Sequence, residues 1–257
     1  MHIWALSDPH LSFHNAAKSM EVFGPLWDNY TQKMQDNWKR LIRDDDLVLI
    51  PGDISWAMRL EEALIDLTWL DKLPGTKVLI KGNHDYWWDS LSKLSKSMPS
   101  SLHCIHNNVF VWNGVAIGGT RLWDTPEYSF EDYIHFQKNE RQRVKTISQE
   151  EEKTAAEKIF ARELQRLELS LSQMPKDAIL RIALTHYPPI DATLQPSRTS
   201  QILENHKIDF CVFGHLHSID KTKPMFGKIR GVEYILASCD YLDFVPKHVI
   251  DLESLKK

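Results

Sequence analysis

Histidine, aspartate and asparagine side chains gather at the ends of five apolar runs in this sequence. The clearest case is Val78–Asp85, VLIKGNHD, where an apolar run stops at Gly82 and three polar side chains follow that can bind a metal ion or move a proton. Gly82 lets the backbone turn there. Four other apolar runs end in the same manner, in SDPH, PGD, THYPP and GHLH. The candidate site residues are therefore Asp8, His10, Asp53, Asn83, His84, Asp85, His186, His215 and His217.

The chemistry of this set points to metal ions. It contains three carboxylates, five imidazoles and one amide. Oxygen and imidazole donors together suit Mn, Fe, Zn or Co, whereas sites made only of oxygen suit Ca or Mg better. The set exceeds the three or four protein ligands of a single zinc ion, so two divalent ions fit better. Two ions roughly 3.5–4 Å apart can hold both the attacking and the leaving oxygen of an in-line displacement at phosphorus.

Each polar cluster follows a run that is typical of a buried strand. The strands expected before the clusters are Ile3–Ser7, Leu47–Ile50, Val78–Ile80, Ile179–Leu184 and Phe210–Phe213. Open α/β sheets bind their ligands beyond the carboxyl ends of the strands, so loops distant in sequence can meet there. Asn113-Gly114 predicts a hairpin between Val109–Trp112 and Val115–Ile117. The closing strands are expected at Val232–Ala237 and His248–Leu252.

Segments with helical periodicity alternate with these strands. We expect helices over Leu26–Ile42, Leu60–Leu70 and Ser200–Asn205, and a short helix capped by Asp89. The alternation predicts an α/β fold, or mixed α+β layers around sheets. A chain of 257 residues fits one domain spanning residues 1–257.

Composition changes over Glu127–Gln173, which is highly charged and contains neither Gly nor Pro. We interpret it as a charged helical insertion. Ser148 and Glu151 match a capping box. The following apolar stripe favours an amphipathic helix packed on the sheet, with a lid or an oligomer surface as the alternatives. The segment Tyr128–Lys145 has weak periodicity and is expected to be mobile. The stripe consists of Ala156, Phe160, Leu164, Leu167 and Leu171.

Charge and composition limit the classes of binding partner that we expect. The net charge is −4, from 31 Lys and Arg against 35 Asp and Glu, and this balance offers no electrostatic footprint for long nucleic acid. It leaves room for a small phosphorylated substrate, including a nucleotide. The three cysteines form no CxxC pair. The N-terminus lacks a signal-peptide pattern and no apolar run reaches the ~18 residues of a membrane span, so we expect a cytoplasmic protein that does not bind membranes. The oligomeric state stays open.

Taken in order, the motifs D-x-H, GD, GNHD, H and GHxH resemble those of the calcineurin-like metallophosphoesterase superfamily. The matching residues run from Asp8 to His217, which is most of the chain. GNHD is the most specific of them, and a lone GD is weak. The resemblance implies a four-layer α/β/β/α sandwich, in which two mixed sheets are flanked by helices.

The resemblance also implies a role for each matching residue. A first metal ion would be held by Asp8, His10 and His217. A second would be held by Asn83, His186 and His215. Asp53 would bridge the two, because a carboxylate has two oxygens to share. The ions, most readily Mn, Fe or Zn, would generate a bridging hydroxide that attacks phosphorus in line.

Two further residues complete the implied catalytic machinery. His84 resembles the family's histidine that contacts the phosphate and protonates the leaving group, and Asp85 would orient its imidazole. The residues after Asp53 are Ile54-Ser55-Trp56, where many members carry Asp or Asn, so an additional ligand there stays open. Arg121 follows a Gly-Gly turn at a strand end and is a candidate for holding a substrate phosphate.

The predicted function is therefore a metal-dependent phosphoesterase acting on a phosphate mono- or diester. The alternatives are a scaffold of the same fold that has lost activity and binds partner proteins, and a nuclease. The aromatic residues that adjoin the motifs either line the mouth of the site or pack in the core. They are Trp87, Trp88, Trp123 and Tyr187. His14 is the best further histidine for the rim of the site.

Overall fold

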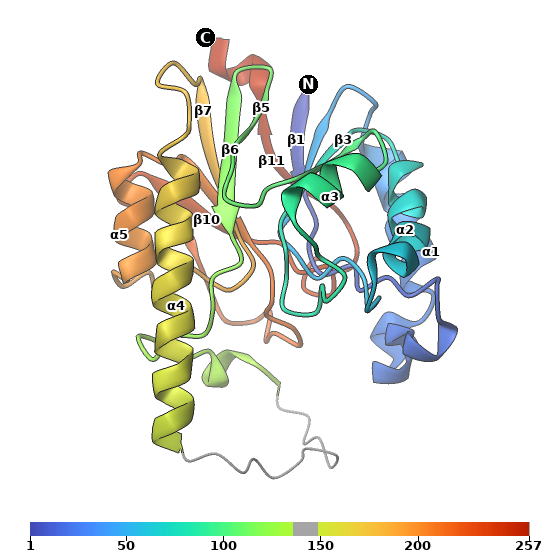
Figure 1. The fold of residues 1–257 in the computed structure, drawn as a ribbon, viewed down its shortest axis with the longest axis horizontal. Coiled ribbons are helices and arrows are strands. Elements are labelled where there is room, and N and C mark those ends of the chain that lie inside the picture. Colours follow the sequence, from blue (N-terminus) through green and yellow to red (C-terminus); the bar gives the residue numbers. More distant parts are fainter. Residues whose placement is uncertain (136–148, 257) are drawn as a thin grey trace.

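Two β-sheets stacked face to face form the centre of the molecule (Figure 1). The computed structural model describes residues 1–135 and 149–256. The first sheet has the order β11-β1-β2-β3-β4, with β1 (His2–Ala5), β2 (Leu47–Ile50), β3 (Thr76–Leu79), β4 (Leu102–Cys104) and β11 (Lys247–Asp251). The second has the order β5-β6-β7-β8-β10-β9, with β5 (Phe110–Trp112), β6 (Val115–Thr120), β7 (Leu180–Thr185), β8 (Phe210–Phe213), β9 (Gly227–Ile229) and β10 (Val232–Leu236).

Both sheets are mixed. Strands β1 to β4 run parallel, and β11 pairs antiparallel with β1. In the second sheet β6, β7, β8 and β10 run parallel, whereas β5 and β9 are antiparallel edge strands. The predicted fold class is confirmed. The polar motifs therefore follow the carboxyl ends of parallel strands, on one common side of the sandwich.

Strand β2 shows how the sequence builds the layers. All four residues of LVLI are buried. Leu47 and Leu49 belong to the core between the two sheets, and Val48 and Ile50 belong to the core under the helices. Because successive side chains point to opposite faces, a strand covered on both faces is apolar at every position.

Helices cover the outer face of each sheet (Figure 1). The helices α1 (Tyr30–Leu41), α2 (Leu60–Asp71) and α3 (Leu91–Ser97) share a core with the first sheet. The helices α4 (Gln149–Leu171) and α5 (Arg198–Asn205) share another with the second. Short 3-10 turns occupy Ala16–Lys18, Met20–Phe23, Pro25–Trp27, Glu131–Tyr133 and Leu252–Lys256. None of the helices in the described part of the chain has the length and apolar character needed to cross a membrane.

Two helix starts differ from the expectations. The helix predicted from Leu26 begins at Tyr30, because Pro25–Trp27 form a separate 3-10 turn and Asn29 has a left-handed φ of 52°. Asp89 does not cap α3. Ser90 holds the N-cap position. The Asp89 carboxylate accepts a hydrogen bond from the backbone N–H of Ser90 (2.7 Å) and pairs with Lys93 (2.8 Å).

The charged segment after β6 belongs largely to the fold itself. Helix α4 is the crossover between the parallel strands β6 and β7, and its apolar stripe is buried at Phe160, Leu167 and Leu171. The packed-helix interpretation is thus confirmed. Ser148, and with it the predicted capping box, lies outside the described residues.

The segment predicted to be mobile, Tyr128–Lys145, falls partly outside the described residues, from position 136 onward. Its described part is docked. The Tyr128 hydroxyl donates to the Pro188 carbonyl at 2.7 Å, and Phe130 and Ile134 pack against the core of the second sheet.

The packing of α4 can be tested with two leucines of the same helix. Leu167 is fully buried, whereas Leu169 is 53% exposed. We expect Leu167→Ala to lower the free energy of unfolding by about 2–5 kcal/mol, and Leu169→Ala by less than about 0.5 kcal/mol. Both changes remove the same atoms, so urea unfolding followed by circular dichroism isolates the burial. Equal losses would contradict the packing of α4 on the second sheet.

Candidate metal centre

The loops that leave five parallel strands meet at one edge of the sandwich. Each carries one or two of the residues expected to bind metal, which are Asp8, His10, Asp53, Asn83, His186, His215 and His217. The two sheets are joined at this edge by a bridge between Ser7 and Ser238. The Ser7 N–H donates to the Ala237 carbonyl (2.6 Å), and the Cys239 N–H donates to the Ser7 carbonyl (2.9 Å). Residues from both sheets can therefore form one site.

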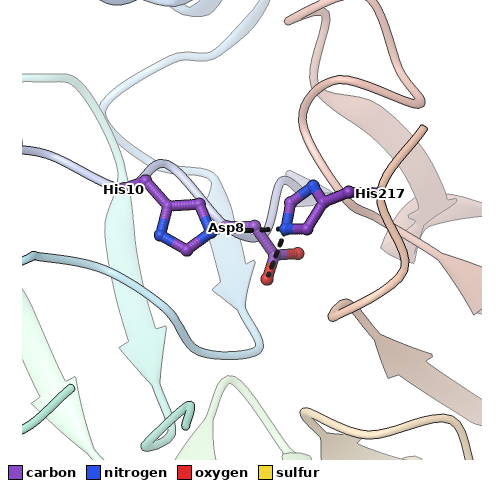
Figure 2. Close-up of side chains that lie close together, drawn as sticks. All are labelled: Asp8, His10 and His217. Carbon is purple, nitrogen blue, oxygen red and sulfur yellow. Dashed lines mark hydrogen bonds and ion pairs between the residues drawn. The ribbon is translucent and has the colours of Figure 1, made fainter. Parts of the chain in front are cut away.

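Asp8, His10 and His217 form a first group of close donor atoms (Figure 2). Their candidate ligand atoms all lie within 4.8 Å of one another. Nε2 of His10 is 3.3 Å from Nε2 of His217, which is 3.9 Å from Oδ1 of Asp8. The structure thus brings together the three residues expected around the first ion.

Asn83, His186 and His215 form a second group. Oδ1 of Asn83 is 2.7 Å from Nε2 of His186 and 3.0 Å from Nδ1 of His215, and these two nitrogens are 3.3 Å apart. Ligands at about 2.1 Å from one tetrahedral ion are roughly 3.4 Å apart. The spacing of these three atoms fits ligands of a single cation.

The Asp53 carboxylate lies between the two groups. Its Oδ2 is 3.7 Å from Nε2 of His10 and 3.5 Å from Nε2 of His186. Its Oδ1 accepts a hydrogen bond from the His84 backbone N–H at 2.8 Å. One oxygen is therefore anchored to the backbone, and the other faces donor atoms of both groups.

Hydrogen bonds on the far side of two rings set their tautomers. Nδ1 of His186 lies 3.0 Å from the Pro51 carbonyl, and Nδ1 of His217 lies 2.8 Å from Oδ1 of Asp240. Both partners can only accept, so each Nδ1 carries a proton and Nε2 is the ligand atom presented to the cluster. This is the usual arrangement of histidines that bind metal.

The ionisation of the buried groups also fits a cation. Burial raises the pKa of Asp8 to about 6. Burial, with the charges of Asp85 and Asp8, holds the pKa of Asp53 well above its ordinary value. Burial lowers the pKa of His217, but Asp240, Asp8 and Asp53 outweigh this and raise it to about 9. A divalent cation would stabilise the carboxylates in their charged form and would displace the His217 proton.

Four of the seven expected ligands have a backbone conformation that side chains disfavour. Positive φ angles occur at Asp8 (57°), His10 (44°), Asp53 (52°) and His215 (71°). Left-handed φ angles are uncommon outside glycine, and each costs about 1–3 kcal/mol in an unfavourable case. Their concentration in one cluster indicates that the position of the side chain, and not local backbone preference, determines these loops.

Two motif glycines allow backbone and carboxylate to approach closely. A Cβ at Gly82 would collide with Oδ1 of Asp53, and a Cβ at Gly214 would collide with Oδ2 of Asp8. Gly82 is not among the glycines with positive φ. It is therefore required for the space beside Asp53, and not for the turn that the sequence suggested.

Asp85 does not orient the His84 imidazole, contrary to the expectation. Its carboxylate is buried and accepts four other hydrogen bonds, from the N–H groups of Gly82 (2.7 Å), Ile54 (2.8 Å) and Ser55 (3.1 Å) and from the Trp87 indole (2.9 Å). The turn at GNHD directs Asp85 into the protein. Nδ1 of His84 has no hydrogen-bond partner in the described part of the chain.

Trp56 belongs to the segment after Asp53, where the sequence left open whether an additional metal ligand is present. Its ring stacks on His10, with centroids 5.0 Å apart and planes at 20°, and lies 4.4 Å from the His84 ring. The residues after Asp53 therefore supply an aromatic wall for two imidazoles. His14, the further histidine considered for the rim, has its Nδ1 3.1 Å from the buried Asp66 carboxylate.

The other motif-adjacent aromatic residues divide between core and site. Trp87 and Trp88 are buried in the core of the first sheet and its helices. The Tyr187 ring lies 4.0 Å from the His215 ring and 5.3 Å from Trp123. Tyr86 is 56% exposed and lies near His84, with ring centroids 6.3 Å apart.

Arg121 lies beside this centre. Its carbonyl accepts hydrogen bonds from the N–H groups of His186 (3.1 Å) and Tyr187 (3.0 Å). Its guanidinium lies over the Trp123 ring at 4.5 Å and lines a neighbouring cavity.

Asp240 is a site residue that the sequence interpretation missed. It is 3% exposed, and besides His217 it accepts a hydrogen bond from the Ser218 N–H at 2.9 Å. A signal was present, because the apolar run Tyr234–Ala237 ends in Ser-Cys-Asp, like the five runs that were recognised.

Asp240→Asn should weaken metal binding. Asparagine lacks the negative charge beside the His217 ring, and its single oxygen cannot accept from both the His217 Nδ1–H and the Ser218 N–H. Loss of such a partner typically lowers metal affinity about 10–100-fold. Titration calorimetry with Mn²⁺ measures the effect. Asp243→Asn is the matched control, because the Asp243 side chain is 70% exposed and pairs with Lys221. Equal affinity in the two variants would refute the role of Asp240.

Comparison with known proteins bears on the family and the fold of the chain. The solved phosphopantetheinyl hydrolase PptH of Mycobacterium tuberculosis is 14% identical, with a TM-score of 0.52 over 98% of this chain and 97% of that chain, a likeness that concerns the fold alone. The protein AQ665 of unknown function from Aquifex aeolicus is also 14% identical, with a TM-score of 0.47 over 96% and 95% of the two chains. The Gene 66 protein of Mycobacterium phage D29 is 35% identical over 83 residues, which are 32% of this chain and 40% of that relative. The family model described as Calcineurin-like phosphoesterase matches residues 1–218, and the chain therefore belongs to this family.

Proposed function

We propose that this protein is a dinuclear metal-dependent phosphoesterase that hydrolyses a phosphate mono- or diester of a small molecule. The observation that carries the proposal is the convergence of seven donor side chains at one edge of the sandwich, where Asp53 faces donors of two neighbouring groups. A single ion would leave several of these buried donors without a partner, which is costly in a protein interior.

The residues fit two divalent cations, with Mn, Fe or Zn the best match to mixed oxygen and imidazole donors. Asp8, His10 and His217 would hold one, and Asn83, His186 and His215 the other, with Asp53 shared. Bound there, such cations lower the pKa of water and neutralise charge on phosphoryl oxygens.

We assign to His84 the protonation of the leaving group. It follows the ligand Asn83 directly, and its ring is half-buried against Trp56. Burial lowers the pKa of His84, and the charge of His217 lowers it further. A bound phosphate anion acts in the opposite direction and favours the protonated ring. Substrate binding thus prepares His84 to donate a proton to the departing alkoxide.

A scaffold without activity is disfavoured. The chain retains His84 together with the whole donor set, and a protein that only binds partners has no use for a strained cluster of buried imidazoles and carboxylates. A nuclease is disfavoured by the net charge of −4.

His84→Ala should lower kcat by about 10²–10⁴-fold for alkyl esters, whose leaving group needs a proton, while metal binding is retained. The loss should be smaller for p-nitrophenyl esters, because p-nitrophenolate leaves without protonation. The assay compares phosphate mono- and diesters of both kinds with the Mn²⁺-loaded enzyme. His103→Ala is the control, because that ring stacks on Phe110 at the edge of the sheets. Equal losses for both leaving groups would exclude His84 as the general acid.

Asp53→Asn should abolish turnover of every ester and lower Mn²⁺ binding, because it removes the shared charge. Turnover and the number of bound ions are measured on the same preparation. If the wild-type protein bound two ions per chain yet hydrolysed no ester with any divalent metal, the scaffold would be supported. If it bound none, the proposal would fail.

A further inference from the structure

A polar cavity of about 410 Å³ opens beside the metal centre, between the loops after β3 and β4, the end of β6 and helix α4. This volume lies in the range of roughly 300–1,000 Å³ that is usual for small-molecule sites. Four cationic side chains line it, namely Lys81, Arg121, Arg162 and Arg166. Two carboxylates line it, namely Asp89 and Glu163. We call it the cationic cavity.

Both carboxylates already have partners, Glu163 within the wall of the cavity and Asp89 outside it. Glu163 is 1% exposed and accepts hydrogen bonds from the Thr120 hydroxyl (2.5 Å) and from Arg166 (2.7 Å). Asp89 pairs with Lys93 (2.8 Å) and accepts from the Ser90 N–H (2.7 Å). They therefore neutralise only part of the positive charge around the cavity.

The remaining cations have no such partners. Within residues 1–135 and 149–256, neither Lys81 nor Arg162 forms an ion pair or a side-chain hydrogen bond. Arg121 approaches Glu163 only at 3.9 Å. Lys81 and Arg121 are both partly buried, and partly buried cations without a counter-charge are unfavourable. An anionic ligand would relieve this imbalance.

The cavity is continuous with the loops of the metal centre. Lys81 stands two residues before Asn83, and the Arg121 carbonyl holds the His186 N–H. The same two loops thus carry both a metal-site residue and a cation of the cavity. We infer that a substrate held at the metal centre extends its next group toward Lys81 and Arg121.

We propose that the cationic cavity binds a second phosphate group of the substrate whose ester bond is cleaved at the metal centre. The proposal rests on the function given above and narrows the substrate to a molecule with at least two phosphates. Guanidinium groups match phosphate oxygens with paired hydrogen bonds, and the cavity offers three of them. It exposes little apolar surface to a base or an acyl chain, because the apolar side chains of its wall are buried, namely Ile80, Trp88 and Ile105.

The first experiment measures binding of inorganic pyrophosphate to the metal-free protein by titration calorimetry. Arg162→Glu is compared with Lys158→Glu, because both residues are exposed on α4, both changes alter net charge equally, and only Arg162 lines the cavity. We expect about tenfold weaker binding in Arg162→Glu, from the loss of one charge-assisted contact. Lys158→Glu should bind like the wild type, and succinate should bind less tightly than pyrophosphate.

Three results would overturn the cavity as a phosphate site. These are no pyrophosphate binding by the wild type, equal binding by the two variants, or binding of succinate as tight as that of pyrophosphate. The absence of metal in this experiment makes its outcome independent of turnover.

The second experiment links the cavity to the reaction. With excess Mn²⁺, propane-1,3-bisphosphonate should inhibit ester hydrolysis more tightly than propylphosphonate, and this advantage should fall about tenfold in Arg162→Glu but persist in Lys158→Glu. An advantage that is the same in both variants overturns the proposal. Pyrophosphate binding that depends on Arg162 in a protein that hydrolyses no ester would support the anion site and refute the proposed function.

Discussion

The buried carboxylate of Asp53 is the constraint on which the rest of the site depends. Its Oδ1 is tied to the His84 N–H at 2.8 Å, so its Oδ2 has one position, 3.7 Å from His10 and 3.5 Å from His186. A carboxylate in such a place is stable only with hydrogen bonds and a counter-charge. Gly82 has no side chain because any Cβ there would occupy the space of this carboxylate.

A polar network between the strand ends fixes the loops around Asp53. Asp85 joins the loop after β2 to the loop after β3 through hydrogen bonds to Ile54 (2.8 Å) and Gly82 (2.7 Å). Asp240, after β10, holds the ring of His217, after β8, at 2.8 Å. The packing of the apolar layers determines where the strands end. The hydrogen bonds of these carboxylates determine the conformation of the loops that follow. The geometry of the donor atoms is therefore set by residues that need not touch a cation.

The sequence predicted the strand ends and the donor set because both depend on local pattern. Each expected ligand follows a largely apolar run, and the parallel order of the strands brings the runs to one edge. The direction of Asp85 was not predictable in this way. His84 and Asp85 are neighbours in a turn, and which of them faces the site depends on partners such as Ile54, which lies 31 residues away. Asp240 was missed although its run ends in the same manner, because its partner is the ring of His217 on another loop, a pairing that only the fold shows.

The contribution of α4 to the cationic cavity could not be predicted from the sequence, for a different reason. Arg162 and Arg166 lie among many charges in Glu127–Gln173, where the pattern indicates an exposed helix face. The buried leucines Leu167 and Leu171 fix the rotation of α4 on the second sheet, and this rotation brings the two arginines to the wall that Lys81 and Arg121 also line. Helix α4, the crossover between β6 and β7, thus contributes no donor to the candidate metal centre. It forms the wall of the cationic cavity, where positive side chains outnumber negative ones. Under the proposed function, chemistry and selectivity would be separable in this chain, since loops at strand ends would supply the first and a helix face the second.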